Sequence, residues 1–461
     1  MNRLAQIILI VRGLLAEPTG DEDMPYEPVI LKSLTDKEAL DGFDKLTTGF
    51  AGSADRAEQA GRCLPHGEKI GGLKPTLQSH GKKIGGLKPT LQSVVGGTQP
   101  VLQDLLKIQK PPLLLSDVDL NGEPDTLRKQ LSDAISDYSQ RHNCKPGIVC
   151  LRGLGILYVD QANQTKHRVK RGKEPPVKLG AKYLAPRYTW GSDLPLRNKV
   201  ALVTGAAGAI GYGICRGLLE NGCYLAATDL AGKKLDDFVA DLKQTGGDRV
   251  IGVPIDVTDK DSVSRGFESV IQIWGGIDIV VVNAGIPLVS YLKDIDLDAF
   301  RRLEKVNVEG TLLTLAEAAQ FFILQGTGGD IIIISSKNVP SPGAGFGAYS
   351  ATKAACHQLG RIASLELAQY DVRVNMVAPD AVFSEGKYKS GLWKEIGPSR
   401  MKARGLDEEQ LQQYYKDRNL LKARVTGRHV ANAVLFFATR QTPTTGATIP
   451  VDGGLPDATP R

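Results

Sequence analysis

Tyr349 and Lys353 are the two side chains of this sequence whose types and spacing best suit proton transfer. They begin and end the segment Tyr-Ser-Ala-Thr-Lys, four residues apart. In a helix this spacing places both side chains on one face, with Cβ atoms about 5–6 Å apart. A free phenol is a poor base at neutral pH, but an ammonium group beside it favours the phenolate. The pair alone is common on exposed helices, so its meaning depends on the residues that surround it.

Three other polar positions converge on the same region. Ser336 ends the apolar run Ile-Ile-Ile-Ile-Ser-Ser, and the segment Asn283–Gly285 follows the apolar run before it. The carboxyl ends of neighbouring parallel strands meet at the edge where open α/β sheets bind ligands. Asn307 lies between these runs, in a segment of helical pattern. The set predicts a catalytic centre in one crevice.

A glycine-rich turn, Thr-Gly-Ala-Ala-Gly-Ala-Ile-Gly from Thr204 to Gly211, joins a short apolar run to a helical pattern. Glycines at such a turn allow a diphosphate to approach the backbone at a helix N-terminus. Asp229 ends the next apolar run, 18 residues beyond Gly211. A carboxylate there accepts hydrogen bonds from ribose hydroxyls and repels a 2′-phosphate. The pattern favours NAD over NADP as cofactor, the alternative for Asp229 being a helix N-cap.

Short apolar runs alternate with helix-length segments from residue 196 onward. Strands that are apolar throughout belong to a parallel sheet covered on both faces, and strict alternation indicates a doubly wound α/β domain. We expect strands over 199–204, 223–228, 249–254, 278–283, 330–335 and 371–379. We expect helices over about 209–221, 232–245, 259–274, 297–325 and 346–369.

With these motifs in order, residues 196–461 resemble a short-chain dehydrogenase/reductase with a Rossmann-type fold. The resemblance implies a catalytic tetrad formed by Asn307, Ser336, Tyr349 and Lys353. It also implies a set of residues at the cofactor: Thr204, Gly205, Gly208, Ile210, Gly211, Asp229, Asp256, Val257, Asn283, Ala284, Gly285, Tyr349, Lys353, Val382 and Ser384. Two positions depart from the pattern, since Ala209 replaces the usual middle glycine and Asp380 stands where glycine is usual.

The implied reaction is hydride exchange at the nicotinamide ring. In it Ser336 would bind the substrate oxygen and Tyr349 would take or give the hydroxyl proton. Lys353 would favour the tyrosinate and hold the nicotinamide ribose, while Asn307 would fix a water that connects Lys353 to solvent. The segment from Phe383 to about Lys422 would cover the substrate, and its polar composition suits a hydroxylated one.

Residues 1–194 have a different character. The formal charge of the chain is +6, of which +5 belongs to residues 1–194 and +1 to the remainder. Residues 66–79 and 80–93 are a tandem repeat of 14 residues that differs at one position, Glu68 and Lys82. Two copies are too few for a packed repeat array, and their Gly-Gly and Lys-Pro pairs indicate turns. His66 and His80 recur with the repeat, but no neighbouring Cys or carboxylate gives metal-site spacing.

Regular structure is expected in two parts of this region. Residues 124–141 have the apolar spacing of an amphipathic helix, and residues 148–159 fit either two strands joined at a glycine turn or a strand and a helix. The basic run 165–178 fits a solvated linker near 165–195 better than a nucleic-acid contact. This part is expected to be a degenerate α+β segment.

A second, more specific resemblance involves segments of both parts of the chain. Residues 378–384 and 440–461 resemble the dehydrogenase half of bifunctional rhamnulose-1-phosphate aldolase/lactaldehyde (alcohol) dehydrogenases, and residues 28–46 and 112–170 weakly resemble the aldolase half. The histidines that the aldolase needs for zinc are not present as a cluster, so no metal is expected. The resemblance implies an NAD-dependent dehydrogenase of small hydroxyaldehydes or sugar-derived alcohols in rhamnose or related carbohydrate metabolism. A working bifunctional enzyme and a non-catalytic NAD-binding scaffold are the alternatives.

The amino-acid composition limits the class of protein and the compartment in which we expect it. Hydrophobic residues make up 42% and charged residues 23%, as in ordinary soluble domains. Six cysteines in 461 residues form no disulfide framework, and Cys215 and Cys223 lie in apolar runs typical of a core. Arg12 interrupts the apolar N-terminus, which argues against a signal peptide or a membrane span. We expect a cytoplasmic homo-dimer or homo-tetramer that acts on a small molecule, with no nucleic-acid or membrane partner.

Overall fold

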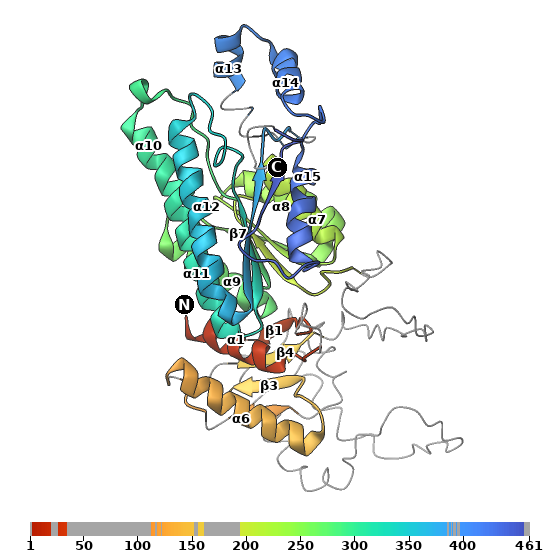
Figure 1. The fold of residues 1–461 in the computed structure, drawn as a ribbon. Helices are drawn as coiled ribbons and strands as arrows, with labels where there is room; N and C mark the ends of the chain where they lie inside the picture. The colour runs from red at the N-terminus through yellow and green to blue at the C-terminus, as the bar shows by residue number, and fades with distance from the viewer. Residues whose placement is uncertain are drawn as a thin grey trace, which may run out of the picture. The chain divides into compact units, whose positions relative to one another are not determined.

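The computed structural model describes residues 2–19, 26–34, 112–115, 118–120, 122–151, 155–160, 194–384, 387–388, 390, 393 and 397–455. These residues form two compact units (Figure 1). The smaller unit contains four strands, a long helix and most of the N-terminal helix. The larger unit contains the described chain from residue 194 onward together with residues 2–5, 16–19 and 26–30. The repeat at 66–93, most of the linker near 165–195, and Cys63, His66, His80 and His167 lie outside the described residues.

The smaller unit is a helix-covered mixed sheet of α+β type. Its elements are α1 (Arg3–Leu15), β1 (Leu31–Leu34), β2 (Leu113–Leu115), α6 (Pro124–His142), β3 (Ile148–Leu151) and β4 (Gly155–Val159). The sheet order is β1-β4-β3-β2, in which only β2 and β3 run parallel.

Two expectations for this unit can be compared with the structure. Helix α6 buries Leu127, Leu131, Ile135 and Tyr138, which confirms the amphipathic helix. Strands β3 and β4 pair antiparallel, so residues 148–159 form two strands rather than a strand and a helix. None of the described helices, α1 included, is long and apolar enough to cross a bilayer.

The larger unit is built on a parallel sheet of seven strands in the order β11-β10-β9-β8-β5-β6-β7. In chain order the strands are β5 (Val200–Val203), β6 (Tyr224–Asp229), β7 (Val250–Pro254), β8 (Ile279–Val282), β9 (Gly329–Ile334), β10 (Val372–Pro379) and β11 (Thr448–Val451). The six expected strands are all present, and β11 extends the sheet beyond β10. Strands β5, β8 and β9 are buried along their whole length, as their apolar composition requires.

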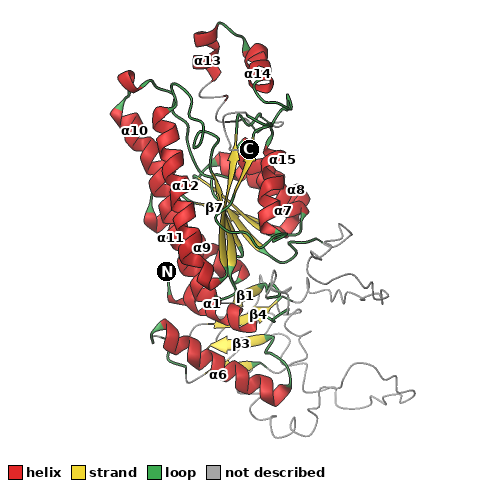
Figure 2. Cartoon of the chain, viewed as in Figure 1, coloured by secondary structure: helices red, strands yellow, loops and turns green. Residues whose placement is uncertain are grey.

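Helices cover both faces of this sheet, with α9, α11 and α12 on one side and α7, α8 and α15 on the other (Figures 1 and 2). The α-helices are α7 (Ala209–Glu220), α8 (Lys233–Gly246), α9 (Lys260–Trp274), α10 (Leu297–Glu304), α11 (Gly310–Gln325), α12 (Gly347–Leu367), α13 (Gly397–Arg404), α14 (Glu408–Asp417) and α15 (Gly427–Ala438). Short 3-10 turns span Gly247–Arg249, Leu292–Asp294 and Ala368–Tyr370. The doubly wound architecture is confirmed.

The long helical region expected over 297–325 is present and includes one π-helical turn. Its start is fixed by Asp296, whose side chain accepts hydrogen bonds from the backbone N–H groups of Asp298 and Ala299, and its end by Gly326 in the left-handed conformation. Between α10 and α11 the backbone takes one π-helical turn, Lys305–Glu309, which contains the buried Asn307. Such turns open the helical hydrogen-bond ladder and are frequent at functional sites.

Candidate active site

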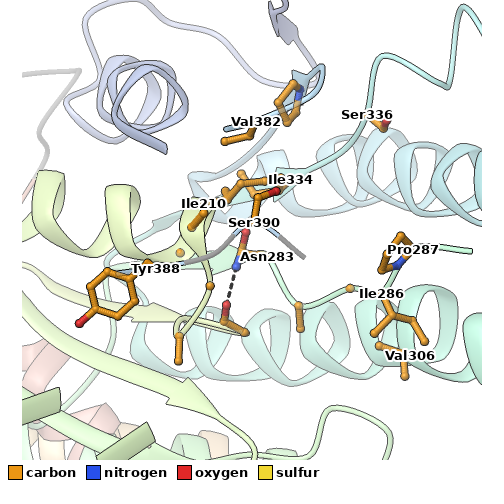
Figure 3. Close-up of a pocket in the computed structure, with 18 of the residues that line it drawn as sticks. Ile210, Asn283, Ile286, Pro287, Val306, Ile334, Ser336, Val382, Tyr388 and Ser390 are labelled. Atoms are coloured by element: carbon orange, nitrogen blue, oxygen red, sulfur yellow. Dashed lines mark hydrogen bonds between the residues drawn. The ribbon is translucent and has the colours of Figure 1, made fainter. Parts of the chain in front are cut away.

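A cavity of about 1520 Å³ lies at the carboxyl ends of the parallel strands of the larger unit. Residues that end or follow β5, β6, β7, β8, β9 and β10 line it. Figure 3 shows Tyr388 at one side of this cavity, Asn283 in its middle, and Pro287 and Ser336 at the other side. The crevice expected from the positions of the sequence motifs is therefore one continuous space.

The glycine-rich turn leaves room for a ligand at the N-terminus of α7. Gly205 has φ +59°, and a Cβ added there would lie 2.7 Å from the Cα of Ala284, so only glycine fits. Gly208 precedes α7, and a Cβ added there would meet no atom within 4 Å. No side chain caps this helix. The turn thus fits a diphosphate, which the N–H groups of the first helical turn would bind.

Asp229 reaches the cavity from the end of β6. One carboxylate oxygen accepts a hydrogen bond from the N–H of Ala207 (3.0 Å), and the other accepts one from the N–H of Leu230 (3.0 Å). Lys234 Nζ lies 3.4 Å from the carboxylate and is mostly exposed. The carboxylate therefore holds the glycine-rich turn and also faces the space where a ribose would lie.

Thr204 and Asn283 tie two of the strand ends together. Thr204 Oγ1 accepts hydrogen bonds from the N–H groups of Asn283 (3.0 Å) and Ala284 (3.1 Å). Asn283 Nδ2 donates to the carbonyl oxygens of Thr204 (3.0 Å) and Gly205 (2.8 Å), and Asn283 lies centrally in Figure 3. Asn283, Ala284 and Gly285 line the cavity, whereas Thr204 does not. Thr204 therefore fixes the turn through these hydrogen bonds, and its contact with the cofactor stays a prediction.

Lys353 and Tyr349 enter the cavity from α12. Lys353 is 7% exposed, and its Nζ donates to the carbonyl oxygen of Ile334 at 2.9 Å. That hydrogen bond fixes the ammonium group at the end of β9 and uses one of its three donors. The ring of Tyr349 packs edge-on against Phe346, with centroids 6.3 Å apart. Both predicted residues line the same cavity.

Ser336 follows β9 and faces the cavity at its Pro287 end (Figure 3). Its side chain is 6% exposed, and its Oγ accepts a hydrogen bond from the N–H of Asn338 (3.1 Å). The hydroxyl hydrogen stays available to donate to a ligand oxygen. The neighbouring Ser335 instead pairs with His357 Nδ1 at 3.0 Å, and burial lowers the pKa of His357.

Asn307 is fully buried in the π-helical turn. Its Oδ1 accepts from the N–H of Ile286 (2.9 Å), and its Nδ2 donates to the carbonyl oxygen of Ile286 and to Thr352 Oγ1, each at 3.1 Å. A Cβ added at Gly285 would lie 3.2 Å from Asn307 Oδ1 and 3.4 Å from Lys353 Nζ. Asn307 does not line the cavity. Its hydrogen bonds connect the turn after β8 to Thr352, the residue before Lys353.

Comparison with known proteins decides the family. A family profile described as short chain dehydrogenase matches residues 199–394. The chain is 32% identical to a glucose 1-dehydrogenase of Gluconobacter oxydans over 263 residues, which are 56% of this chain and 92% of that protein. The chain belongs to the short-chain dehydrogenase family. It is an oxidoreductase that acts on CH–OH groups.

Two other similarities bear on this dehydrogenase. It is 33% identical over 288 residues to the uncharacterized oxidoreductase YuxG of Bacillus subtilis, covering 62% of this chain but only 41% of that protein. The crystal structure of a sorbitol-6-phosphate 2-dehydrogenase from Erwinia amylovora superposes with a TM-score of 0.52 and 28% identity, covering 55% of this chain and 98% of that one. The larger unit thus has the extent of a whole short-chain dehydrogenase, whereas the chain spans less than half of YuxG.

The remaining predicted cofactor residues differ in their placement in the dehydrogenase. Asp256, Val257 and Val382 line the cavity, as do Ile210 and Gly211. Asp256 Oδ1 also accepts hydrogen bonds from the N–H and hydroxyl of Thr258, which fixes the turn after β7. Ser384 does not line the cavity, and its Oγ accepts a hydrogen bond from the N–H of Ser390 (2.9 Å), which does line it. The role of Ser384 at the cofactor stays a prediction.

Several cavity-lining residues of the dehydrogenase were not predicted from its sequence. Tyr388 donates to Asp241 Oδ2 (2.6 Å) and stacks on Tyr212, with ring centroids 4.1 Å apart. Lys337, Arg400, Arg404 and Arg418 line the cavity as well. The excess of basic residues within 387–428 could have indicated Arg400, Arg404 and Arg418, whereas no local motif indicated Lys337 or Tyr388.

Proposed function

We propose that this dehydrogenase transfers a hydride between NAD and a small sugar-derived alcohol, hydroxyaldehyde or carbonyl compound of lactaldehyde type. The observation that carries the proposal is that one cavity holds Asp229 and Gly208 together with Ser336, Tyr349 and Lys353. Two similar proteins are named for sugar substrates, glucose and sorbitol 6-phosphate. The many polar side chains of the cavity suit a hydroxylated substrate.

The proposed mechanism assigns each proton and charge to a residue of the chain. When bound, NAD supplies the hydride acceptor or donor. Ser336 donates a hydrogen bond to the substrate oxygen and stabilises the charge that develops on it. Tyr349 takes the hydroxyl proton during oxidation and returns it during reduction. Lys353, fixed by the carbonyl oxygen of Ile334, holds the nicotinamide ribose and adds a positive charge to the site.

Asn307 acts in this proposal as a positioning residue. Both polar atoms of its side chain are used by Ile286 and Thr352, and its carbonyl oxygen accepts a hydrogen bond from Cys356 Sγ at 2.9 Å. It thereby fixes the residue next to Lys353 in α12. The water that the family resemblance implies between Asn307 and Lys353 stays a prediction.

The choice of NAD over NADP rests on Asp229. Its negative charge at the end of β6 would repel a 2′-phosphate, and its oxygens would accept hydrogen bonds from ribose hydroxyls. Lys234 partly offsets that charge at 3.4 Å. Lys234 is mostly exposed, so water screens its charge, and the carboxylate decides the preference.

Replacement of Tyr349 by phenylalanine tests the proposal. The substitution keeps the ring against Phe346 and removes the hydroxyl that transfers the proton. We expect NAD affinity within about twofold of wild type and turnover lowered by about 10²-fold or more. NADH absorbance with lactaldehyde, polyols, polyol phosphates and simple secondary alcohols measures turnover, and calorimetry measures NAD binding. The matched control is Tyr370→Phe, since Tyr370 is 42% exposed and lies outside the cavity. Wild-type turnover by Tyr349→Phe would contradict the assignment.

We further propose that the smaller unit is a degenerate aldolase-like segment without lyase activity, and that residues 1–194 and 196–461 are separate domains. Its described residues contain no group of three His, Cys, Asp or Glu side chains that could hold a metal ion. Stoichiometric zinc, together with cleavage of a ketose 1-phosphate, would contradict this and favour a bifunctional enzyme. A cytoplasmic location, a role in rhamnose metabolism and a homo-dimer or homo-tetramer stay predictions.

A further inference from the structure

A group of basic side chains lines the cavity on the side of the catalytic residues. Lys337 directly follows Ser336, and Arg400 of α13 lies over the ring of Phe346, with its guanidinium carbon 4.7 Å from the centroid. Phe346 in turn contacts Tyr349. Arg404 of α13 lines the same wall. We call Lys337, Arg400 and Arg404 the basic wall.

The charge of the basic wall is not neutralised by the described protein. Arg418 and Asp380 form an ion pair at 3.4 Å, so the carboxylate at this end is already shared. Among the described residues, no ion pair joins an acidic side chain to any member of the basic wall. Lys337 donates to the carbonyl oxygen of Ser341, and Arg400 donates to that of Ala344. These neutral acceptors fix the two side chains but leave their charge uncompensated.

Lys337 and Arg400 are half-buried, whereas Arg404 is exposed, so desolvation of the first two is costly unless an anion pairs with them. The Nε atom of Arg400 is buried and has no hydrogen-bond partner among the described residues. Burial also lowers the pKa of Lys337, a shift that Asp380 opposes and that Arg418 and Arg400 increase. A buried donor that lacks an acceptor and a lysine that faces two arginines are both stabilised by a bound anion.

We propose that the substrate carries a phosphate monoester, bound by the basic wall while its CH–OH group lies at Ser336 and Tyr349. This rests on the proposed function and specifies its substrate class. A guanidinium group binds a phosphate with two parallel hydrogen bonds, and three uncompensated cations suit a dianion better than the single charge of a carboxylate. The cofactor does not account for the basic wall, because its phosphates are expected at Gly208, the N-terminus of α7.

Calorimetry on the full-length, NAD-loaded protein tests this without requiring turnover. The probes are sorbitol, sorbitol 6-phosphate, gluconate and inorganic phosphate. We expect sorbitol 6-phosphate to bind at least about tenfold more tightly than sorbitol or gluconate, and inorganic phosphate to compete with it. Arg400→Gln is expected to weaken sorbitol 6-phosphate by about 10- to 100-fold and to leave sorbitol within about twofold.

Lys402→Gln is the matched control. It removes the same charge from the same helix, but Lys402 is exposed and does not line the cavity, so wild-type affinity is expected. Arg404→Gln is a second variant should Arg400→Gln fail to fold by circular dichroism. Equal affinity for sorbitol and its phosphate, a preference for gluconate, or equal weakening by Lys402→Gln would overturn the inference. A preserved phosphate preference without NAD reduction by any alcohol would instead contradict the proposed function.

Discussion

Single residues in this dehydrogenase combine a structural contact with a chemical role, and Asp229 is the clearest case. Its carboxylate fixes the glycine-rich turn through Ala207 and faces the expected ribose position. The sequence predicted Asp229, Ser336, Tyr349 and Lys353 as cavity residues because each follows a strand or lies at helical spacing. It could not predict that Ser384 turns toward Ser390, because that depends on how a loop closes on itself.

The charge of Asp229 can be tested apart from its structural role. Asp229→Asn keeps an oxygen that accepts the Ala207 N–H but removes the charge that repels a 2′-phosphate, while Lys234 remains. We expect the ratio of NADP to NAD affinity to rise about tenfold, about 1.4 kcal/mol. Calorimetric titration with both cofactors measures the ratio. Asp236→Ala, an exposed position of α8 outside the cavity, should leave it unchanged. An unchanged ratio in Asp229→Asn would assign the discrimination to other residues.

At the scale of helices and strands, sequence patterns predict some elements and miss others. The alternation of apolar runs and amphipathic segments predicted β5 through β10 and the helices between them to within a few residues, because both faces of the sheet are covered. The π-helical turn around Asn307 has no local signature. The contact between α8 and the segment after β10 has no local signature either, because its partners Tyr388 and Asp241 are 147 residues apart.

That contact predicts a kinetic effect on the cofactor. Tyr388 and Asp241 both line the cavity, and the hydrogen bond from Tyr388, with that from Lys387, holds the pKa of Asp241 below its usual value. Tyr388→Phe keeps the stacking on Tyr212 but releases the bond between two walls of the cavity. We expect NADH to dissociate about three- to tenfold faster, as for loss of a hydrogen bond to a charged group. Stopped-flow fluorescence measures the rate, with exposed Tyr291→Phe as control. An unaltered rate would show that this contact does not retain the cofactor.

At the scale of the whole chain, the larger unit is stabilised at the end of the sheet opposite to the cavity. Asp330 at the start of β9 is 2% exposed and accepts hydrogen bonds from Arg373 Nε and Arg440 Nε, each at 3.0 Å. Arg440, which follows α15, also pairs with Asp371 at 3.0 Å. This network joins two strands and a helix that are distant in sequence, so composition and periodicity gave no sign of it. None of its members lines the cavity, so we expect the network to contribute to stability and not to catalysis.

Asp330→Asn tests that separation. The substitution leaves the buried Arg440 and the half-buried Arg373 without their shared carboxylate, and loss of one partner of a buried ion pair costs about 3–5 kcal/mol. We expect the urea midpoint of the larger unit to fall accordingly, measured by circular dichroism and by loss of NADH binding. NAD affinity of the folded protein should stay within about twofold of wild type. Asp298→Asn breaks the exposed pair with Arg301 and should leave the midpoint almost unchanged. If both variants unfold at the wild-type midpoint, the buried network does not stabilise the fold, and packing of the helices on the sheet alone must do so.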